Sequence, residues 1–276
     1  GVQDPLYRLL SHRRGSRSLQ GSMAGRQGID KRGRGETILK HFKRELDHIE
    51  RWKDLRKDLF RNEEPQIKLI GMTTPTEEMI SLGVTTETLP AYTARQSHES
   101  AGTYEDDLNL NKKLISWGHQ TCLEAVQFVY YVTGVSKSLA GQRTRHRIGI
   151  GWTFRSTRYV KASKNTFIYP ALEYIDSEDV VRSAYGAYER EHKRAIEVYD
   201  ELKELGIRNQ ELRRLMPVGW STAAYVYVNA RSLRHFFELR LDKSAEWEIR
   251  RLAYMMFDSV MGIAPTLFED LAGEIL

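Results

Sequence analysis

The chain has 276 residues, of which 41% are hydrophobic and 29% charged, as is typical of a globular protein rather than a fibrous or low-complexity chain. The longest apolar runs are too short to cross a bilayer, and no signal-peptide core is present, so we expect a cytoplasmic protein without a membrane partner. Cys122 is the only cysteine, which excludes an internal disulfide and any zinc site built on several thiolates. A lone cysteine is more often a small buried hydrophobe than a nucleophile.

The net charge of +5 is concentrated at the N-terminus. Residues 1–61 carry 16 lysines and arginines against 8 acidic residues, whereas the remainder carries 26 against 29. Residues 1–35 are rich in Gly, Ser and Arg without apolar periodicity, so they are predicted to be a disordered basic tail or the remnant of an expression vector. A general affinity for polyanions is expected, if anywhere, of this N-terminal part.

Residues 36–64 are predicted to form a helical extension. Apolar side chains recur three and four residues apart, with charges of both signs on the other faces. The interleaved acidic residues would weaken contact with phosphates, so we expect this helix to pack on its own domain or on a neighbouring subunit. A nucleic-acid partner is not expected.

Residues 65–276 are predicted to form one domain. The strands are expected at Ile67–Met72, Gln127–Thr133, Tyr159–Tyr169 and Ala223–Val228. The helices are expected at Pro75–Gly83, Ala91–Ser97, Leu108–Gly118, Val135–Arg143, Ser177–Leu205, Asn209–Leu215, Asn229–Arg240 and Ala245–Ile263, with a polar loop at His98–Asp107. The sequence therefore predicts a helix-rich α+β fold, with a modest antiparallel sheet flanked by long helices.

The stretch from Gln142 to Tyr159 reads QRTRHRIGIGWTFRSTRY and contains five arginines. Guanidinium groups bind phosphate in bidentate fashion, and the glycines at 149 and 151 let backbone N–H groups approach an anion closely. We interpret the stretch as a site for a phosphate-bearing ligand. A basic surface loop or an RNA-binding patch is the alternative.

Two further clusters are ambiguous by themselves. If residues 229–240 are helical, Arg231, Arg234 or His235, and Glu238 share one face, which is either a binding face or a solvated one. His119 and Glu124 suggest a general base or a metal site, but no third ligand is evident. A buried, hydrogen-bonded histidine is therefore favoured at position 119, and no metal is expected.

Four separated blocks resemble the flavin-dependent thymidylate synthase (ThyX) family. The family signature is RHR, seven residues, then Ser-x-Arg-Tyr, and this chain has Arg145-His146-Arg147 followed by Ser156-Thr157-Arg158-Tyr159. The other blocks are Thr93-Ala94-Arg95-Gln96-Ser97, the segment from Gly118 to Glu124, and Asn229-Ala230-Arg231-Ser232-Leu233 with Leu239-Arg240 and Ala245-x-Trp247-Glu248-Ile249. They occur in the family's order, over roughly residues 66–270.

The resemblance implies a homotetramer with active sites shared between subunits. It implies FAD as cofactor, NADPH and methylenetetrahydrofolate as co-substrates, and methylation of dUMP at C5 without a cysteine nucleophile. The implied catalytic residue is Arg240, which stabilises an ionised pyrimidine edge. The implied FAD-binding residues are Ser97, His119, Thr121, Glu124, Arg145, His146, Arg147, Asn229, Arg231 and His235, the last standing where the family usually has Asn. The implied substrate-binding residues are Gln142, Ser156, Thr157, Arg158, Arg213 and Arg240.

The interval between Arg147 and Ser156 departs from the family pattern. It holds eight residues instead of seven, and it lacks the usual S-x-N-E, whose Glu ordinarily faces the sugar of the nucleotide. We expect Trp152 and Phe154 to reshape that wall. A wall without the carboxylate suits UMP as well as dUMP, as in the relative that methylates UMP in polyoxin-type nucleoside antibiotic biosynthesis. A catalytically inactive nucleotide- or RNA-binding protein is the alternative from another class.

Overall fold

The computed structural model describes residues 65–143, 145–159 and 167–272, and every structural statement below concerns these ranges. The chain divides into two units, residues 1–36 and 37–276. The tail and the helical extension expected over residues 1–64 lie outside the described residues, so both stay predictions.

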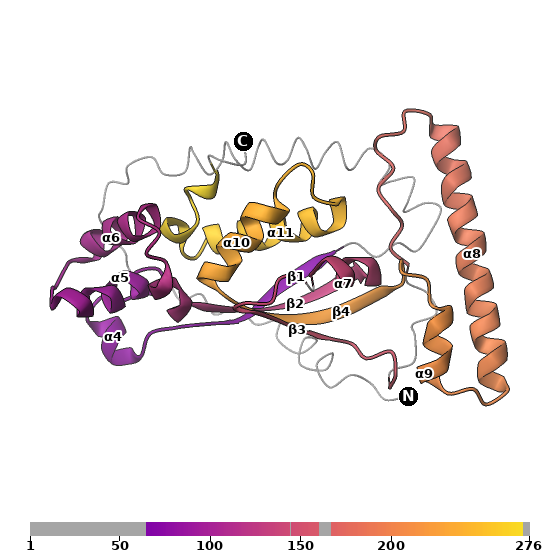
Figure 1. Ribbon diagram of the computed structural model, residues 1–276, viewed down its shortest axis with the longest axis horizontal. Helices are drawn as coiled ribbons and strands as arrows, with labels where there is room; N and C mark the ends of the chain where they lie inside the picture. The colour runs from indigo at the N-terminus through magenta and orange to yellow at the C-terminus, as the bar shows by residue number, and fades with distance from the viewer. Residues whose placement is uncertain (1–64, 144, 160–166, 273–276) are drawn as a thin grey trace, which may run out of the picture. The chain divides into compact units, whose positions relative to one another are not determined.

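A four-stranded antiparallel sheet lies at the centre of the described domain (Figure 1). Its order is β1 (Gln66–Met72), β2 (Gln127–Ser136), β4 (Ser221–Asn229) and β3 (Ile150–Phe154). Burial alternates along the strands, because successive side chains of a strand point to opposite faces. Phe128 and Tyr130 of β2, with Val226 and Val228 of β4, are fully buried on one face.

Two helices cover this buried face, α10 (Ala230–Arg240) and α11 (Trp247–Met261) (Figure 1). Phe236 and Phe237 of α10, with Leu252 and Met256 of α11, join the strand residues in one apolar core. Asn229 ends β4 and caps α10, because its Oδ1 accepts the backbone N–H of Ser232 at 2.8 Å. The strand-to-helix junction is thereby fixed at the residues that the resemblance assigns to the site.

The first half of the chain adds short helices at one end of the sheet: α4 (Glu77–Ser81), α5 (Leu89–Ala94), η1 (Arg95–His98), α6 (Tyr104–Ser116) and η2 (Thr121–Ala125). The loop expected at His98–Asp107 is partly wrong, because α6 begins at Tyr104. The side chains of Thr103 and Asp106 each accept the backbone N–H of the other residue and so cap the N-terminus of α6. These helix-starting residues are polar, as loop residues usually are. α5 begins two residues before the predicted start at Ala91. Pro90 lies in its first turn, where the missing N–H breaks no hydrogen bond of the helix.

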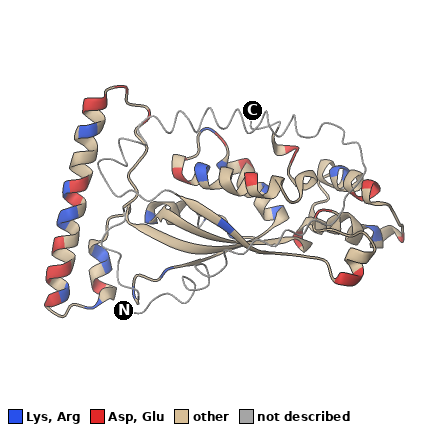
Figure 2. Ribbon diagram, turned by 180° about the vertical axis from the view of Figure 1, so that it is seen from behind, with Lys and Arg blue, Asp and Glu red and all other residues tan. Residues whose placement is uncertain are grey.

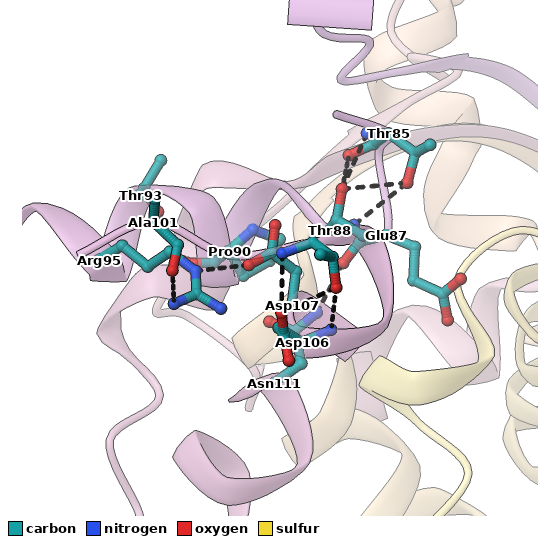
Figure 3. A network of polar contacts seen from close by, with 11 residues as sticks. Thr85, Glu87, Thr88, Pro90, Thr93, Arg95, Ala101, Asp106, Asp107 and Asn111 are labelled. Carbon is teal, nitrogen blue, oxygen red and sulfur yellow. Dashed lines mark hydrogen bonds and ion pairs between the residues drawn. The ribbon is translucent and has the colours of Figure 1, made fainter. Parts of the chain in front are cut away.

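Figure 3 shows the polar network that joins α5, η1 and α6. Arg95 donates to Asp107 at 2.6 Å and to the carbonyl of Ala101 at 3.0 Å, and both charged side chains are largely buried. Gly102 lies against this guanidinium, since a Cβ there would approach Nη2 to 2.0 Å. The Arg95 network therefore fixes the course of the loop that follows Ser97.

A second, smaller core lies between α8 (Glu178–Glu204) and the segments around it, α9 (Asn209–Leu212) and η3 (Arg213–Leu215). Its buried aromatic members are Phe167, Tyr169, Tyr185, Tyr199 and Trp220. Ser177 caps α8 and Gly206, at φ +84°, follows its end, so α8 lies within the predicted range Ser177–Leu205. Figure 2 shows charges of both signs along α8, and no helix in the described ranges is long and apolar enough to span a membrane.

The helix-rich α+β class is confirmed, and the sheet contains one strand that the sequence did not predict. β3 occupies Ile150–Phe154, inside the basic stretch, and α7 (Lys137–Arg143) precedes it. Residues 160–166 of the strand expected at Tyr159–Tyr169 lie outside the described residues, so that strand stays a prediction; Phe167 forms a bridge with Trp220. β3 pairs with β4 along its whole length, and this tertiary contact makes a strand of a segment whose neighbouring arginines give no strand signal.

Candidate functional site

Arg240, the last residue of α10, is held by two neutral acceptors. Its Nε donates to Nε2 of His146 at 2.9 Å, and its Nη2 donates to the backbone carbonyl of Gln142 at 3.4 Å. Within the described ranges no carboxylate forms a salt bridge with Arg240, so the protein leaves the charge of this guanidinium uncompensated. Such a group is available to an anion or an electron-rich carbonyl.

His146 is neutral in this arrangement. A guanidinium N–H can only donate, so Nε2 of His146 carries the lone pair and Nδ1 the proton. Burial lowers the pKa of His146 to about 4, helped by the charge of Arg240 and by His235. The ring packs edge-on against Phe236, with centroids 5.0 Å apart. Burial also lowers the pKa of Arg240, and the charge of Arg145 adds to the effect, so Arg145 of the signature lies near this guanidinium.

Helix α7 delivers Gln142 to this cluster, and α11 holds both ends of α7. At its start, Ser136 donates its N–H and its hydroxyl to the two oxygens of Glu248, both at 2.5 Å. The same hydroxyl accepts the N–H of Leu139 at 3.2 Å. At the other end, Gln142 donates Nε2 to Glu246 at 3.3 Å. Burial raises the pKa of Glu246, and raises that of Glu248 to about 7.

A second cluster lies where η2 meets the start of α10. Arg231 and Glu124 pair at 2.6 Å, and both side chains are about half exposed, so the pair is screened and readily exchanged for a ligand. His119 is exposed, with its ring 6.1 Å from that of Trp117, so the burial expected of it is wrong. Thr121 is exposed beside it. The described residues contain no group of three possible metal ligands.

Gly149 packs the end of the signature loop against the N-terminus of α10. Its φ is +65°, and its carbonyl accepts the N–H of Asn229 at 3.1 Å. A Cβ would lie 2.1 Å from Oγ of Ser232 and 2.5 Å from Nδ2 of Asn229. Only glycine fits this close approach. Because Gly149 packs against the N-terminus of α10, the short loop that contains Arg145 and Arg147 leads to the positive end of the dipole of this eleven-residue helix.

Of the two alternatives for the face predicted within residues 229–240, the structure exposes His235 and buries Arg234. Arg234 is only 3% exposed and pairs with Asp270 through both amino groups, at 2.5 and 2.7 Å. It also donates to the carbonyl of Leu267 at 2.6 Å. Arg234 therefore anchors the C-terminal segment, whereas Arg231 and His235 are exposed on the helix.

Ser156, Thr157 and Arg158 lie beyond β3, at the opposite end of that strand from Arg145–Arg147. The guanidinium of Arg158 lies over the ring of Tyr159 at 5.3 Å. Arg158 also lines an open hollow of about 420 Å³, together with Tyr159, Lys203, Gly206, Ile207, Arg208, Asn209 and Gln210. The sequence analysis did not select Lys203 and Arg208. The only sequence signal for them is that these two cations flank Gly206, the glycine that follows the end of α8.

Arg213 lies in η3, directly after the segment that lines this hollow. Its Nε donates to the carbonyl of Gln210, a lining residue, at 3.1 Å. Burial lowers the pKa of Lys137, and the charge of Arg213 lowers it further, so Arg213 also lies near the start of α7.

Ser97 lies in η1, exposed, with its hydroxyl donating to the carbonyl of Ala94 at 2.7 Å. Trp152 and Phe154 stack with centroids 5.9 Å apart, and Trp152 packs on the apolar core. Both side chains lie on the face of β3 that is turned toward the core. That they reshape a sugar-binding wall stays a prediction. Cys122 is partly buried, and burial raises the pKa of its thiol, which makes it a poor nucleophile at neutral pH.

Comparison with known proteins agrees with the motif blocks. The family model described as "Thymidylate synthase complementing protein" matches residues 78–266, well over half of the chain. The chain belongs to this family. The flavin-dependent thymidylate synthase of Geobacter sulfurreducens is 34% identical over 158 residues, which cover 57% of this chain and 66% of that protein. That of Pyrococcus abyssi is 31% identical over 161 residues, covering 56% and 64%.

The chain thus spans just under two thirds of the length of these family members. A solved structure, the UMP/dUMP methylase PolB from Streptomyces cacaoi bound with 5-Br dUMP, superposes with a TM-score of 0.64 at 20% identity. The match covers 75% of this chain and 94% of PolB, which shows that the two share a fold.

Proposed function

We propose that the chain is a flavin-dependent uridylate methyltransferase. It would transfer a one-carbon unit from methylenetetrahydrofolate to C5 of dUMP or UMP, with NADPH as the reductant. Family membership and the fold shared with PolB support the reaction class.

The uncompensated guanidinium of Arg240 carries the proposal. Placed at O4 of a uracil, it would stabilise the pyrimidine ionised at N3, whose negative charge over N3, C4 and O4 makes C5 a nucleophile. C5 would bond to the methylene carbon and lose its proton, the bond between that carbon and the folate nitrogen would break with release of tetrahydrofolate, and a hydride would complete the methyl group. No thiolate is required, in keeping with the poor nucleophilicity of Cys122. Neutral His146 keeps Arg240 in place without neutralising it, as a carboxylate would.

A bound flavin would supply the hydride. The residues around Gly149 fit its diphosphate, because the glycine admits no Cβ and leads the signature arginines to the start of α10. We assign to the flavin the residues named by the resemblance: Ser97, His119, Thr121, Glu124, Arg145, His146, Arg147, Asn229, Arg231 and His235. The exposed Glu124–Arg231 pair would open to admit it.

We assign the 5′-phosphate of the nucleotide to Arg158 and Arg213, with Ser156, Thr157 and Gln142 as further substrate contacts. The hollow lined by Arg158, Lys203 and Arg208 supports an anionic ligand there, because three cations and no acidic residue line it. As the resemblance to the family implies, we propose that a second copy completes each site, in a homotetramer.

A competition assay tests the proposal. Protein incubated with FAD and desalted should keep a flavin absorbance band, and with NADPH and methylenetetrahydrofolate it should form 5-methyl products from a mixture of dUMP and UMP. Retained flavin with no methyl product would leave the nucleotide-binding alternative, and failure to retain flavin would contradict the proposal. We include UMP because the interval between Arg147 and Ser156 lacks the sugar-facing carboxylate of the family.

A further inference from the structure

The Glu246 carboxylate is fixed in place by the helix that it caps. Its Oε2 accepts the backbone N–H of Glu248 at 3.1 Å and that of Ile249 at 3.4 Å, which closes the first turn of α11. The same oxygen accepts Nε2–H of Gln142 at 3.3 Å. A rigid acceptor therefore lies against one side of the Gln142 amide.

This contact decides which way the amide of Gln142 faces. An amide offers an NH₂ donor on one side and an oxygen acceptor on the other, and the two are interchanged by a simple rotation. Because Glu246 presents an oxygen that only accepts, the NH₂ must face it. Oε1 of Gln142 is then the group left for a ligand, and no hydrogen bond to Oε1 is recorded among the described residues.

Arg240 presents the opposite chemistry beside it. Its Nη2 lies 3.4 Å from the backbone carbonyl of Gln142, and a guanidinium has donors only. Arg240, a donor, therefore contacts the backbone of the residue whose side chain offers the acceptor. Uracil as it binds, before N3 is ionised, shows the matching edge, O4 as acceptor beside N3–H as donor. Cytosine shows the reverse, an amino donor beside an N3 acceptor.

We propose that Glu246 is a positioning residue that makes this site select uracil over cytosine nucleotides, by holding the Gln142 amide with its oxygen toward the base. The inference rests on the proposed function, because it requires a pyrimidine beside Arg240.

Three variants isolate the effect of the contact. Glu246→Ser keeps a side-chain cap on α11 but is too short to reach Gln142. Glu246→Gln keeps an oxygen that both caps the helix and accepts from Gln142, so it should behave as the wild type. Gln142→Leu removes the acceptor itself and decides the question if Glu246→Ser fails to fold. Dissociation constants for UMP and CMP are measured by calorimetry on the flavin-loaded full chain.

Wild type and Glu246→Gln should prefer UMP over CMP by about tenfold or more, the usual consequence of mismatching one buried hydrogen-bonding pair. Glu246→Ser and Gln142→Leu should bring the two nucleotides within about threefold, chiefly by weakening UMP. A wild-type ratio in Glu246→Ser, or in Gln142→Leu, would overturn the inference, as would an equal loss in Glu246→Gln. If one of these contradicting results is found while the wild type methylates uridylate, only this inference fails. If the wild type binds neither nucleotide, the proposed function is refuted as well.

Discussion

Replacing Glu248 with Gln should change how the stability of the protein depends on pH. Glu248 is 2% exposed and accepts both donors of Ser136, in the contact that holds α7 to α11. Gln reproduces the neutral carboxylic acid: its oxygen accepts the N–H of Ser136, and its amide donates to the hydroxyl. The variant therefore removes the charge and keeps the packing.

Burial raises the pKa of Glu248 from 4.5 to about 7. A raised pKa means that the folded state holds the proton more tightly than the unfolded state, so the stabilisation is complete below pH 4.5 and is lost as the pH rises through 7. At about 1.4 kcal/mol per pH unit, roughly 3 kcal/mol of unfolding free energy is lost across this window, most of it between pH 5 and pH 8.

Urea denaturation followed by circular dichroism at pH 5, 6, 7 and 8, at one protein concentration, measures this effect. Other titrating groups cancel in the difference between the variant and the wild type. Relative to wild type, Glu248→Gln should gain about 2–3 kcal/mol of stability between pH 5 and pH 8. The exposed Glu197 of α8 provides a matched control, because Glu197→Gln makes the same chemical change without touching a buried side chain. Parallel curves for Glu248→Gln and wild type would refute the account of Glu248.

Three further predictions concern the site and its support. Gly149→Ala should weaken retention of flavin at least about tenfold, since its Cβ would meet Ser232 and its φ is positive; undiminished flavin absorbance after desalting would contradict this. Arg158→Gln combined with Arg208→Gln should raise the KM for the nucleotide at least about tenfold with less effect on kcat, and an unchanged KM would remove the hollow from the site. Arg95→Lys should destabilise the protein by about 1–3 kcal/mol in urea denaturation, because an ammonium cannot reproduce both contacts of the guanidinium, and a wild-type midpoint would show the network to be dispensable.

Much of the fold follows from local sequence signals. The periodicities of residues 177–205 and 229–240 predict α8 and α10 to within a residue or two, and Ser177 and Gly206 mark the ends of α8. β3 is not predictable in this way, because five residues beside an arginine cluster become a strand only through pairing with β4. Likewise, the cap that starts α6 lies in a polar segment that resembles a loop until its reciprocal hydrogen bonds are seen.

The candidate site shows the same division. Motif blocks point to Arg240, His146 and Gln142, and the structure brings these three together. Spacing alone cannot tell which residue of a helix faces the core, and Arg234, on α10 between Arg231 and His235, is buried in a salt bridge. Glu246 and Glu248 acquire their contacts only when α11 packs on α7, residues more than a hundred positions apart in the chain.

The central claim is that Arg240 activates a uridylate without a cysteine nucleophile. The most direct test is the rate of methyl transfer to uridylate by Arg240→Ala, beside Arg194→Ala, which removes an exposed arginine of α8. The account predicts that Arg240→Ala keeps its flavin and loses methyl transfer by at least about a hundredfold, while Arg194→Ala matches the wild type. Methyl transfer at the wild-type rate by flavin-loaded Arg240→Ala would contradict it.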